Sequence, residues 1–114
     1  MSKVRIGCDT VHIPRFTSVM TRTPATRERL FLPEEENDAS WESLAGIFAL
    51  KEAVMKALEL QPGCWQDIQV VKHGNGRPEV ILDDLDFYWN ITSQDVSISH
   101  DGDQAFAVAI FLVE

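Results

Sequence analysis

The sequence predicts an α+β fold in which one long helix and one shorter helix pack on a small, mostly antiparallel sheet. A long stretch after Ser40 has the apolar periodicity of a helix, and Pro62-Gly63 follows it. Two short β-like runs then flank a glycine-rich loop, and the C-terminal region reads as a polar strand that turns and returns as an apolar one. A length of 114 residues supports one core, so we expect residues 1–114 to form a single domain.

The N-terminal third predicts a strand followed by a short helix. Residues 4–8 read as a strand that ends at Asp9. Pro14 lies where a first helical turn would begin, and residues 15–20 continue it. Residues 21–29 indicate a loop or a frayed helix, and Pro33 is a further turn signal.

The long helix is expected from about Ser40, as N-cap, to Leu60, where Pro62-Gly63 stops it. At about 100° per residue, one apolar stripe contains Leu44, Ile47, Phe48, Val54, Met55 and Leu58. Lys51 projects near the middle of this stripe, which is costly unless its amine reaches a partner or solvent. Glu52 and Lys56 are spaced i, i+4 on the flank, and such a pair taken alone is most often an ordinary surface pair.

The remainder predicts two hairpins. Residues 68–72 and 80–82 would pair around the loop at 73–78, residues 83–86 would be a connection or the start of a short acidic helix, and residues 87–89 would cap the core. The closing hairpin joins 96–100 to 105–113. Because strand side chains alternate, His100 shares a face with Val96 and Ile98, whereas Ser97 and Ser99 face the other way. A Ser-His dyad within this strand is therefore geometrically poor.

Composition excludes several classes of protein. A net charge of −8 argues against a nucleic-acid-binding protein, and no apolar run approaches the roughly 20 residues that span a bilayer. The N-terminal residues do not form a signal peptide, so we expect a cytoplasmic protein. Cys8 and Cys64 have no metal-ligand spacing and are read as reduced packing residues.

The charges are unevenly distributed. Between positions 10 and 33 the basic residues are Arg15, Arg22, Arg27 and Arg29, and Glu28 is the only acid. An acidic stretch follows at 34–38. A locally basic surface on an acidic protein suits an acidic partner or a phosphorylated ligand. From charge alone, a solvated helix face explains it equally well.

Five segments, taken in order, resemble the phosphopantetheinyl transferase superfamily. They are residues 6–16, 29–35, 44–58, Gly76-Arg77-Pro78 and 96–101, and the most specific is the Phe-Ala-x-Lys-Glu-Ala-x-x-Lys-Ala block at 48–57. The length and motif order are similar to the short holo-acyl-carrier-protein synthases. The resemblance covers essentially the whole chain, and it implies one phosphopantetheinyl transferase-like domain.

The resemblance implies an enzyme that moves 4′-phosphopantetheine from coenzyme A to a serine of an acyl carrier protein and releases 3′,5′-ADP. Asp9 and Glu52 would bind Mg²⁺, and Lys56 would stabilise the phosphates beside them. The catalytic set is therefore Asp9, Glu52 and Lys56. The coenzyme A contacts would be Lys56, Gly76, Arg77, Pro78, Ser99 and His100, and the carrier-protein contacts Arg15, Met20 and Arg22. Family members of this length form homotrimers with active sites shared between subunits.

One departure from the family pattern is Ile47, where members commonly carry an arginine before the Phe of the block. It leaves open an alternative: a catalytically weak relative that binds coenzyme A or the carrier protein. The sequence also leaves open the general base and whether the carrier serves fatty-acid, polyketide or peptide synthesis.

Overall fold

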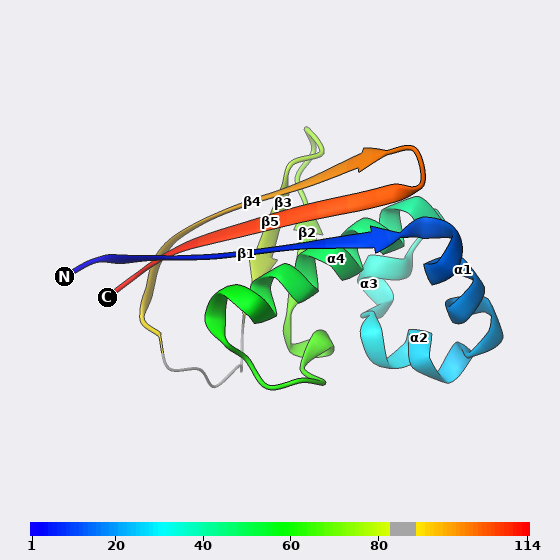
Figure 1. Ribbon diagram of the computed structural model, residues 1–114, viewed down its shortest axis with the longest axis horizontal. Coiled ribbons are helices and arrows are strands. Elements are labelled where there is room, and N and C mark those ends of the chain that lie inside the picture. Colours follow the sequence, from blue (N-terminus) through cyan, green and yellow to red (C-terminus); the bar gives the residue numbers. More distant parts are fainter. Residues whose placement is uncertain (83–88) are drawn as a thin grey trace.

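The computed structural model describes residues 1–82 and 89–114, in which a three-stranded antiparallel sheet packs on one long helix (Figure 1). In chain order the elements are β1 (Lys3–His12), α1 (Ile13–Arg22), α2 (Pro24–Leu30), α3 (Pro33–Glu36), α4 (Trp41–Leu58), the 3₁₀ helix η1 (Trp65–Asp67), β2 (Gln69–Lys72), β3 (Pro78–Ile81), β4 (Ile91–Asp101) and β5 (Gln104–Val113). The α+β prediction is confirmed. The connection or short helix predicted at residues 83–86, and most of the core cap predicted at residues 87–89, lie outside the described residues.

The main sheet has the order β1-β5-β4, so the last strand in the sequence lies in the middle. β1 pairs with β5 along its whole length, from Lys3 opposite Val113 to His12 opposite Gln104. The predicted end of this strand at Asp9 is therefore wrong: pairing continues for three more residues, and Asp9 lies inside the strand opposite Ala107. The closing hairpin is confirmed, with β4 beginning at Ile91, earlier than expected.

Three alanines lie on the inner face of β5, and their small side chains let α4 approach closely. Ala105, Ala107 and Ala109 are fully buried against the helix. On β1, a Cβ added to Gly7 would lie 2.1 Å from the carbonyl oxygen of Ala53 in α4. Only glycine allows that approach.

α4 begins and ends with local backbone signals. The hydroxyl of Ser40 accepts a hydrogen bond from the Ser43 amide at 3.0 Å, as the sequence predicts. The helix stops at Leu58, before the predicted Leu60, because Glu59 takes a left-handed conformation with φ 55°. The amide of Leu60 then bonds back to the carbonyl of Met55.

The helix crosses the sheet from β4 to β1. Near its N-terminal half, a Cβ on Gly46 would lie 2.8 Å from Ile98 and 3.0 Å from His100 in β4. Near its C-terminal half, Ala53 and Ala57 lie against Gly7 of β1. This crossing decides which strand residues meet which turn of the helix.

The other elements cover the remaining sides of α4. β2 and β3 form a separate antiparallel hairpin, so the one predicted sheet is two sheets. Residues 21–29, expected as loop or frayed helix, largely form α2, because Pro24 occupies a first-turn position where its missing amide proton costs nothing. Figure 1 shows α1, α2 and α3 at the end of the molecule opposite the two termini.

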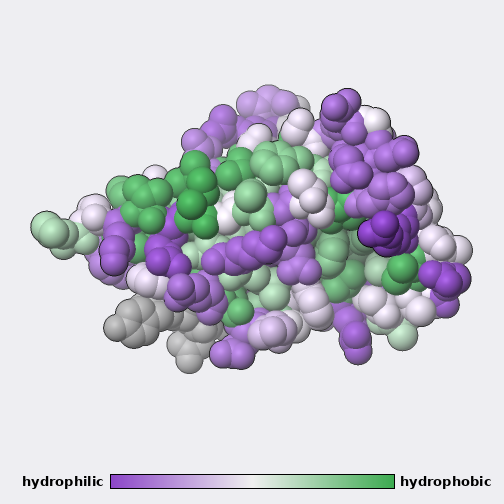
Figure 2. All heavy atoms as spheres, viewed as in Figure 1, coloured by the Kyte–Doolittle hydropathy of each residue, from purple (hydrophilic) through white to green (hydrophobic). Residues whose placement is uncertain are grey.

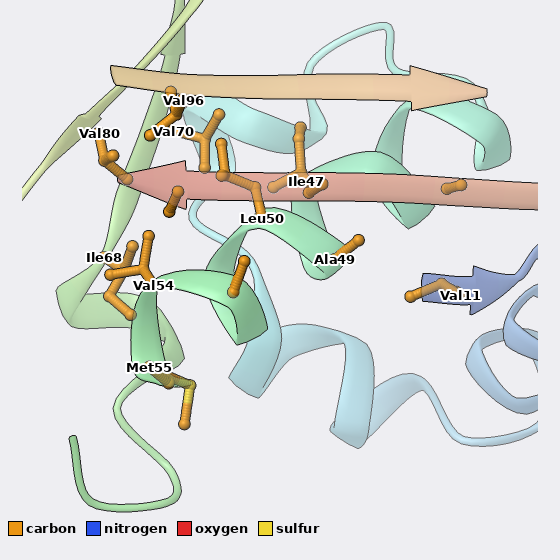
Figure 3. Packing of buried hydrophobic residues seen from close by; sticks show 14 of the residues in the cluster. Val11, Ile47, Ala49, Leu50, Val54, Met55, Ile68, Val70, Val80 and Val96 are labelled. Carbon is orange, nitrogen blue, oxygen red and sulfur yellow. The ribbon is translucent and has the colours of Figure 1, made fainter. Parts of the chain in front are cut away.

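One hydrophobic core joins these parts. Figure 3 shows Leu50 and Val54 of α4 among buried residues that come from both hairpins and from β1, including Val80, Val96 and Val11. Trp89 packs on the edge of this core, and its indole N–H donates to the carbonyl of Leu58 at 2.9 Å. Residues 87–89 were predicted to cap the core, and Trp89, the one described residue of that segment, does so.

The outer face of the sheet is apolar and exposed. Val4 is 63% and Ile6 62% exposed on β1, and Phe106 is 42% and Ile110 38% exposed on β5. Figure 2 shows hydrophobic side chains gathered on this side of the molecule. Cys8 is exposed beside them, which corrects its prediction as a packing residue: alternation along β1 places Gly7 inward and Cys8 outward.

Among the described residues, no helix is both long enough and apolar enough to cross a bilayer.

Candidate functional site

Asp9, Glu52 and Lys56 come together where β1 crosses the C-terminal half of α4. The Nζ of Lys56 donates to Oδ1 of Asp9 at 2.9 Å and to the carbonyl oxygen of Cys8 at 3.0 Å. The neighbouring Gly7 sets the strand against the helix, so the Asp9 carboxylate reaches the turn that carries Glu52 and Lys56. The ion pair of Lys56 is therefore with Asp9 on another element, and the surface reading of Glu52 and Lys56 as a pair of their own is corrected.

The charges in this group perturb one another. Burial raises the pKa of Glu52 above its usual range, and the neighbouring Asp9 charge raises it further, while the Trp65 N–H and Lys56 act in the opposite direction. The hydrogen bond to Asp9 raises the pKa of Lys56, so its amine stays cationic at neutral pH. Two carboxylates that repel each other beside one cation form a site for further positive charge.

These residues suit a hard divalent cation with an incomplete set of protein ligands. No cluster of three or more His, Cys, Asp or Glu ligands occurs within the described ranges 1–82 and 89–114. Asp9 and Glu52 instead offer two carboxylates at a partly exposed position. Mg²⁺ is commonly held by one or two carboxylates, with water and substrate phosphate as the other ligands.

Lys51, one residue before Glu52, has a completely different environment. Its side chain is 0% exposed, and its amine donates to Oε1 of Glu35 at 2.7 Å and to the carbonyls of Leu30 and Trp65 at 2.8 and 2.9 Å. Burial lowers the pKa of Lys51, and its bond to Glu35 opposes that effect. The sequence required that this amine reach either a partner or solvent, and the structure supplies three acceptors.

His100 lies at the other end of the crossing, on the helix side of β4. Its Nε2 is 3.0 Å from the carbonyl oxygen of Glu42, and because a carbonyl only accepts, Nε2 carries a proton and Nδ1 is left for another contact. His100 shares its face with Val96 and Ile98, and Ser99 is exposed on the other face. The sequence prediction against a Ser-His dyad is consistent with this alternation.

The loop Gly76-Arg77-Pro78 borders a separate open hollow of about 560 Å³. The hollow is lined by Asn75, Gly76, Arg77, Pro78, Asp95, Val96, Ser97, Val108 and Ile110. Arg77 forms an ion pair with Asp95 across this hollow. The lining does not include Asp9, Glu52, Lys56 or His100, so a single chain does not bring all of the predicted coenzyme A contacts together.

The predicted carrier contacts divide into exposed and buried residues. Arg15 and Arg22 are exposed on α1, at opposite ends of the helix. Met20 is only 5% exposed and belongs to the core, because it lies on the inward side of the same helix as Phe16. Met20 therefore supports this surface from beneath and presents little of its own side chain.

Two residues of this region were not found by sequence reasoning. Glu35 sits in an acidic stretch that reads as surface, although it is 5% exposed and satisfies Lys51. Trp65 affects the Glu52 carboxyl, but nothing in the sequence connects two residues from a helix and a later 3₁₀ turn. The one available signal for Glu35 was the position of Lys51 on the apolar stripe, because a buried amine there needs a hydrogen-bond acceptor.

Comparison with known proteins agrees on one family. The family model described as the 4′-phosphopantetheinyl transferase superfamily matches residues 5–110. The holo-acyl-carrier-protein synthase of Micrococcus luteus is 43% identical over 116 residues, covering 94% of this chain and 90% of that protein. The Frankia alni enzyme of the same name is 39% identical over 119 residues, covering 96% and 98%.

Solved structures give the same result. The holo-acyl-carrier-protein synthase of Helicobacter pylori, in complex with coenzyme A, superposes with a TM-score of 0.79 at 36% identity, covering 96% of this chain and 99% of that one. The Bacillus anthracis enzyme, in complex with coenzyme A (3′,5′-ADP), has a TM-score of 0.79 at 26% identity, covering all of both chains.

Proposed function

The chain belongs to the 4′-phosphopantetheinyl transferase superfamily and is a holo-acyl-carrier-protein synthase, and on this premise we propose that Asp9, Glu52 and Lys56 form its reaction centre. The enzyme transfers 4′-phosphopantetheine from coenzyme A. The observation that carries the proposal is the meeting of these three side chains from β1 and α4, with Lys56 bonded to Asp9.

Asp9 and Glu52 are proposed to bind Mg²⁺. The raised pKa of Glu52 supports this, because burial beside a second carboxylate costs free energy that a divalent cation offsets. When bound, the cation would neutralise charge on the coenzyme A diphosphate. Lys56 has a side chain that is 58% exposed and can turn from Asp9 to a phosphate oxygen.

The transfer itself requires one bond to form and one to break. The serine oxygen of the carrier protein bonds to the phosphorus that bears the pantetheine arm, and the bond from that phosphorus to 3′,5′-ADP breaks in line with it. The serine proton passes to a water held by the Asp9 and Glu52 carboxylates. Lys56 stabilises the negative charge on the transferred and departing oxygens.

The coenzyme A contacts are proposed to come from adjacent subunits of a homotrimer. Gly76, Arg77 and Pro78 border one hollow, and Ser99 and His100 lie at the far end of β4. The apolar outer face of β1 and β5 is the surface that we assign to subunit contact, since a monomer gains nothing from exposing it. Nδ1 of His100 would be the atom that contacts a phosphate.

The acyl carrier protein is proposed to dock on α1. Arg15 and Arg22 supply positive charge on an otherwise acidic enzyme, and complementary charge chiefly accelerates encounter with an acidic partner. Met20 holds the helix to the core beneath them. With coenzyme A as donor, we propose a cytoplasmic location.

The proposed centre is tested by mass spectrometry. The full chain is incubated with coenzyme A, Mg²⁺ and a panel of apo carrier proteins, and a carrier should gain the mass of one phosphopantetheine. Glu52→Gln should lower the rate about a hundredfold or more, since a Lewis acid supplies several kcal/mol of charge stabilisation. Glu59→Gln is the matched control: Glu59 caps the same helix and its exposed carboxylate pairs with Arg5, so its loss should leave the rate near wild type.

Two results would count against the proposal. An undiminished rate in Glu52→Gln would remove Glu52 from the metal site. Failure of the wild type to modify any carrier, with coenzyme A binding intact, would favour the alternative of a weak relative that only binds.

A further inference from the structure

Trp65 carries a buried polar atom that nothing in the fold explains. Its indole nitrogen Nε1 is shielded from solvent and makes no well-formed hydrogen bond with any residue in the described ranges. Buried indole N–H groups nearly always have a partner. The unpaired N–H of Trp65 therefore calls for an explanation.

The group beside this donor is the Glu52 carboxylate. The indole N–H of Trp65 lies within reach of the Glu52 side chain, and no other carboxylate is placed beside it within the described ranges. The indole is therefore a neighbour of Glu52 whose donor does not form a well-aligned hydrogen bond.

Trp65 is held in place from both sides. Its carbonyl accepts from the buried amine of Lys51 at 2.9 Å, and the next residue, Gln66, donates from its side-chain amide to the carbonyls of Glu28 and Phe31. The Lys51 amine is itself bonded to Glu35. The backbone of the 3₁₀ turn that carries the indole is therefore tied to both α4 and α2.

We propose that Trp65 is a positioning residue that donates its indole N–H to the Glu52 carboxylate and orients it toward the metal. The inference rests on the proposed function, in which Glu52 is a metal ligand. Carboxylates that bind metals are usually held by such an outer hydrogen bond, and losing one typically lowers metal affinity about 10- to 100-fold. Lys51 and Glu35 act one step further out, because they hold the backbone of Trp65.

The direct test measures metal binding, with Mn²⁺ as the probe. Free Mn²⁺ is quantified by electron paramagnetic resonance during titration of the full-length protein in the presence of coenzyme A. Trp65→Phe should weaken Mn²⁺ binding about tenfold or more. In the transfer assay it should raise the Mg²⁺ concentration for half-maximal rate by a similar factor, with most of kcat recovered at saturating Mg²⁺.

Trp89→Phe is the matched control. It removes an indole N–H that donates to a backbone carbonyl at the end of the same helix, away from Glu52. Its Mn²⁺ affinity should stay within about twofold of wild type. Equal weakening in both variants would overturn the proposal, since it would reflect a general loss of packing, and so would unchanged binding in Trp65→Phe.

A measurement on the unaltered protein covers the case in which Trp65→Phe does not fold. In ¹H–¹⁵N spectra, the indole N–H of Trp65 should shift downfield and exchange more slowly with water when Mg²⁺ and coenzyme A are added, and that of Trp89 should not. No change at Trp65 under saturating conditions would refute the inference. Glu52→Gln separates the two levels: if it retains wild-type Mn²⁺ affinity, the proposed metal site is wrong, whatever Trp65 does.

Discussion

The buried pair of Lys51 and Glu35 gives the sharpest prediction about stability. Lys51→Met removes an amine whose three protons are all used, on Glu35, Leu30 and Trp65. It also leaves a carboxylate in the core with no cation. Removing one member of a buried pair costs about 3–5 kcal/mol, which is a large share of the roughly 5–15 kcal/mol that stabilises a domain.

The double variant Lys51→Met/Glu35→Met distinguishes two explanations of that cost. If the charges alone mattered, replacing both by apolar groups would restore stability or increase it. Here the pair also satisfies backbone groups: Lys51 serves the carbonyl of Leu30, and Glu35 accepts from the amides of Leu32 and Val70 at 2.8 Å each. The pair also supplies a fourth bond, to the Trp65 carbonyl, but that carbonyl keeps the hydrogen bond from the Ile68 amide. At about 1 kcal/mol for each of the other three bonds, the double variant should remain about 3 kcal/mol less stable than wild type.

The assay is urea unfolding followed by circular dichroism. All variants are compared at one protomer concentration, because assembly would make the apparent stability depend on concentration. Lys72→Met, at an exposed position of β2, is the control and should lie within about 0.5 kcal/mol of wild type. A double variant as stable as wild type would refute the reasoning, since it would show that the backbone groups are satisfied without the pair.

Three further predictions concern the approach of β1 to α4, the sheet face and the basic helix. Gly7→Ala should lower the free energy of unfolding by about 1–3 kcal/mol or more, because its Cβ would lie 2.1 Å from the Ala53 carbonyl; an unchanged urea midpoint would contradict this contact. Ile6→Asp should convert the assembled protein to monomers in analytical ultracentrifugation and lower transfer, whereas a wild type that sediments as a monomer would remove the trimer proposal. Arg15→Glu should slow carrier association about tenfold at low salt and less at high salt, with KM for coenzyme A unchanged; a rate independent of salt would place the docking surface elsewhere.

The sequence predicted the elements well wherever one local signal determined them. Ser40 caps the long helix as its hydroxyl indicated, and the strand alternation of β4 placed His100 on the side of Ile98. The end of β1 was mispredicted because it depends on pairing with β5, a strand about a hundred residues later. Residues 21–29 were left open between a loop and a frayed helix, because a short helix starting at Pro24 has little periodicity to reveal it.

The candidate site could be predicted only through the family motifs. Lys56 and Glu52 are one helical turn apart, so their proximity follows from the sequence, but the approach of Asp9 depends on Gly7 meeting the backbone of α4. No pattern in one chain announces such a crossing. For the same reason Glu35 looked like a surface acid: burial is a property of the assembled fold, and its neighbours Glu34 and Glu36 are not buried.

Lys51 and Glu52 show how one helix serves stability and chemistry at once. Consecutive helical residues point about 100° apart, so Lys51 enters the core while Glu52 lies beside Asp9 of β1. Trp65 touches both, through its carbonyl on Lys51 and its indole beside Glu52. A change at the buried pair should therefore reach the proposed metal site by moving Trp65, even though neither Lys51 nor Glu35 is a proposed metal ligand. Variants of the pair that still fold should lose Mn²⁺ affinity together with Trp65→Phe, and adding Trp65→Phe to them should cause little further loss. A fully additive loss would mean that the pair and the indole act on Glu52 by separate routes.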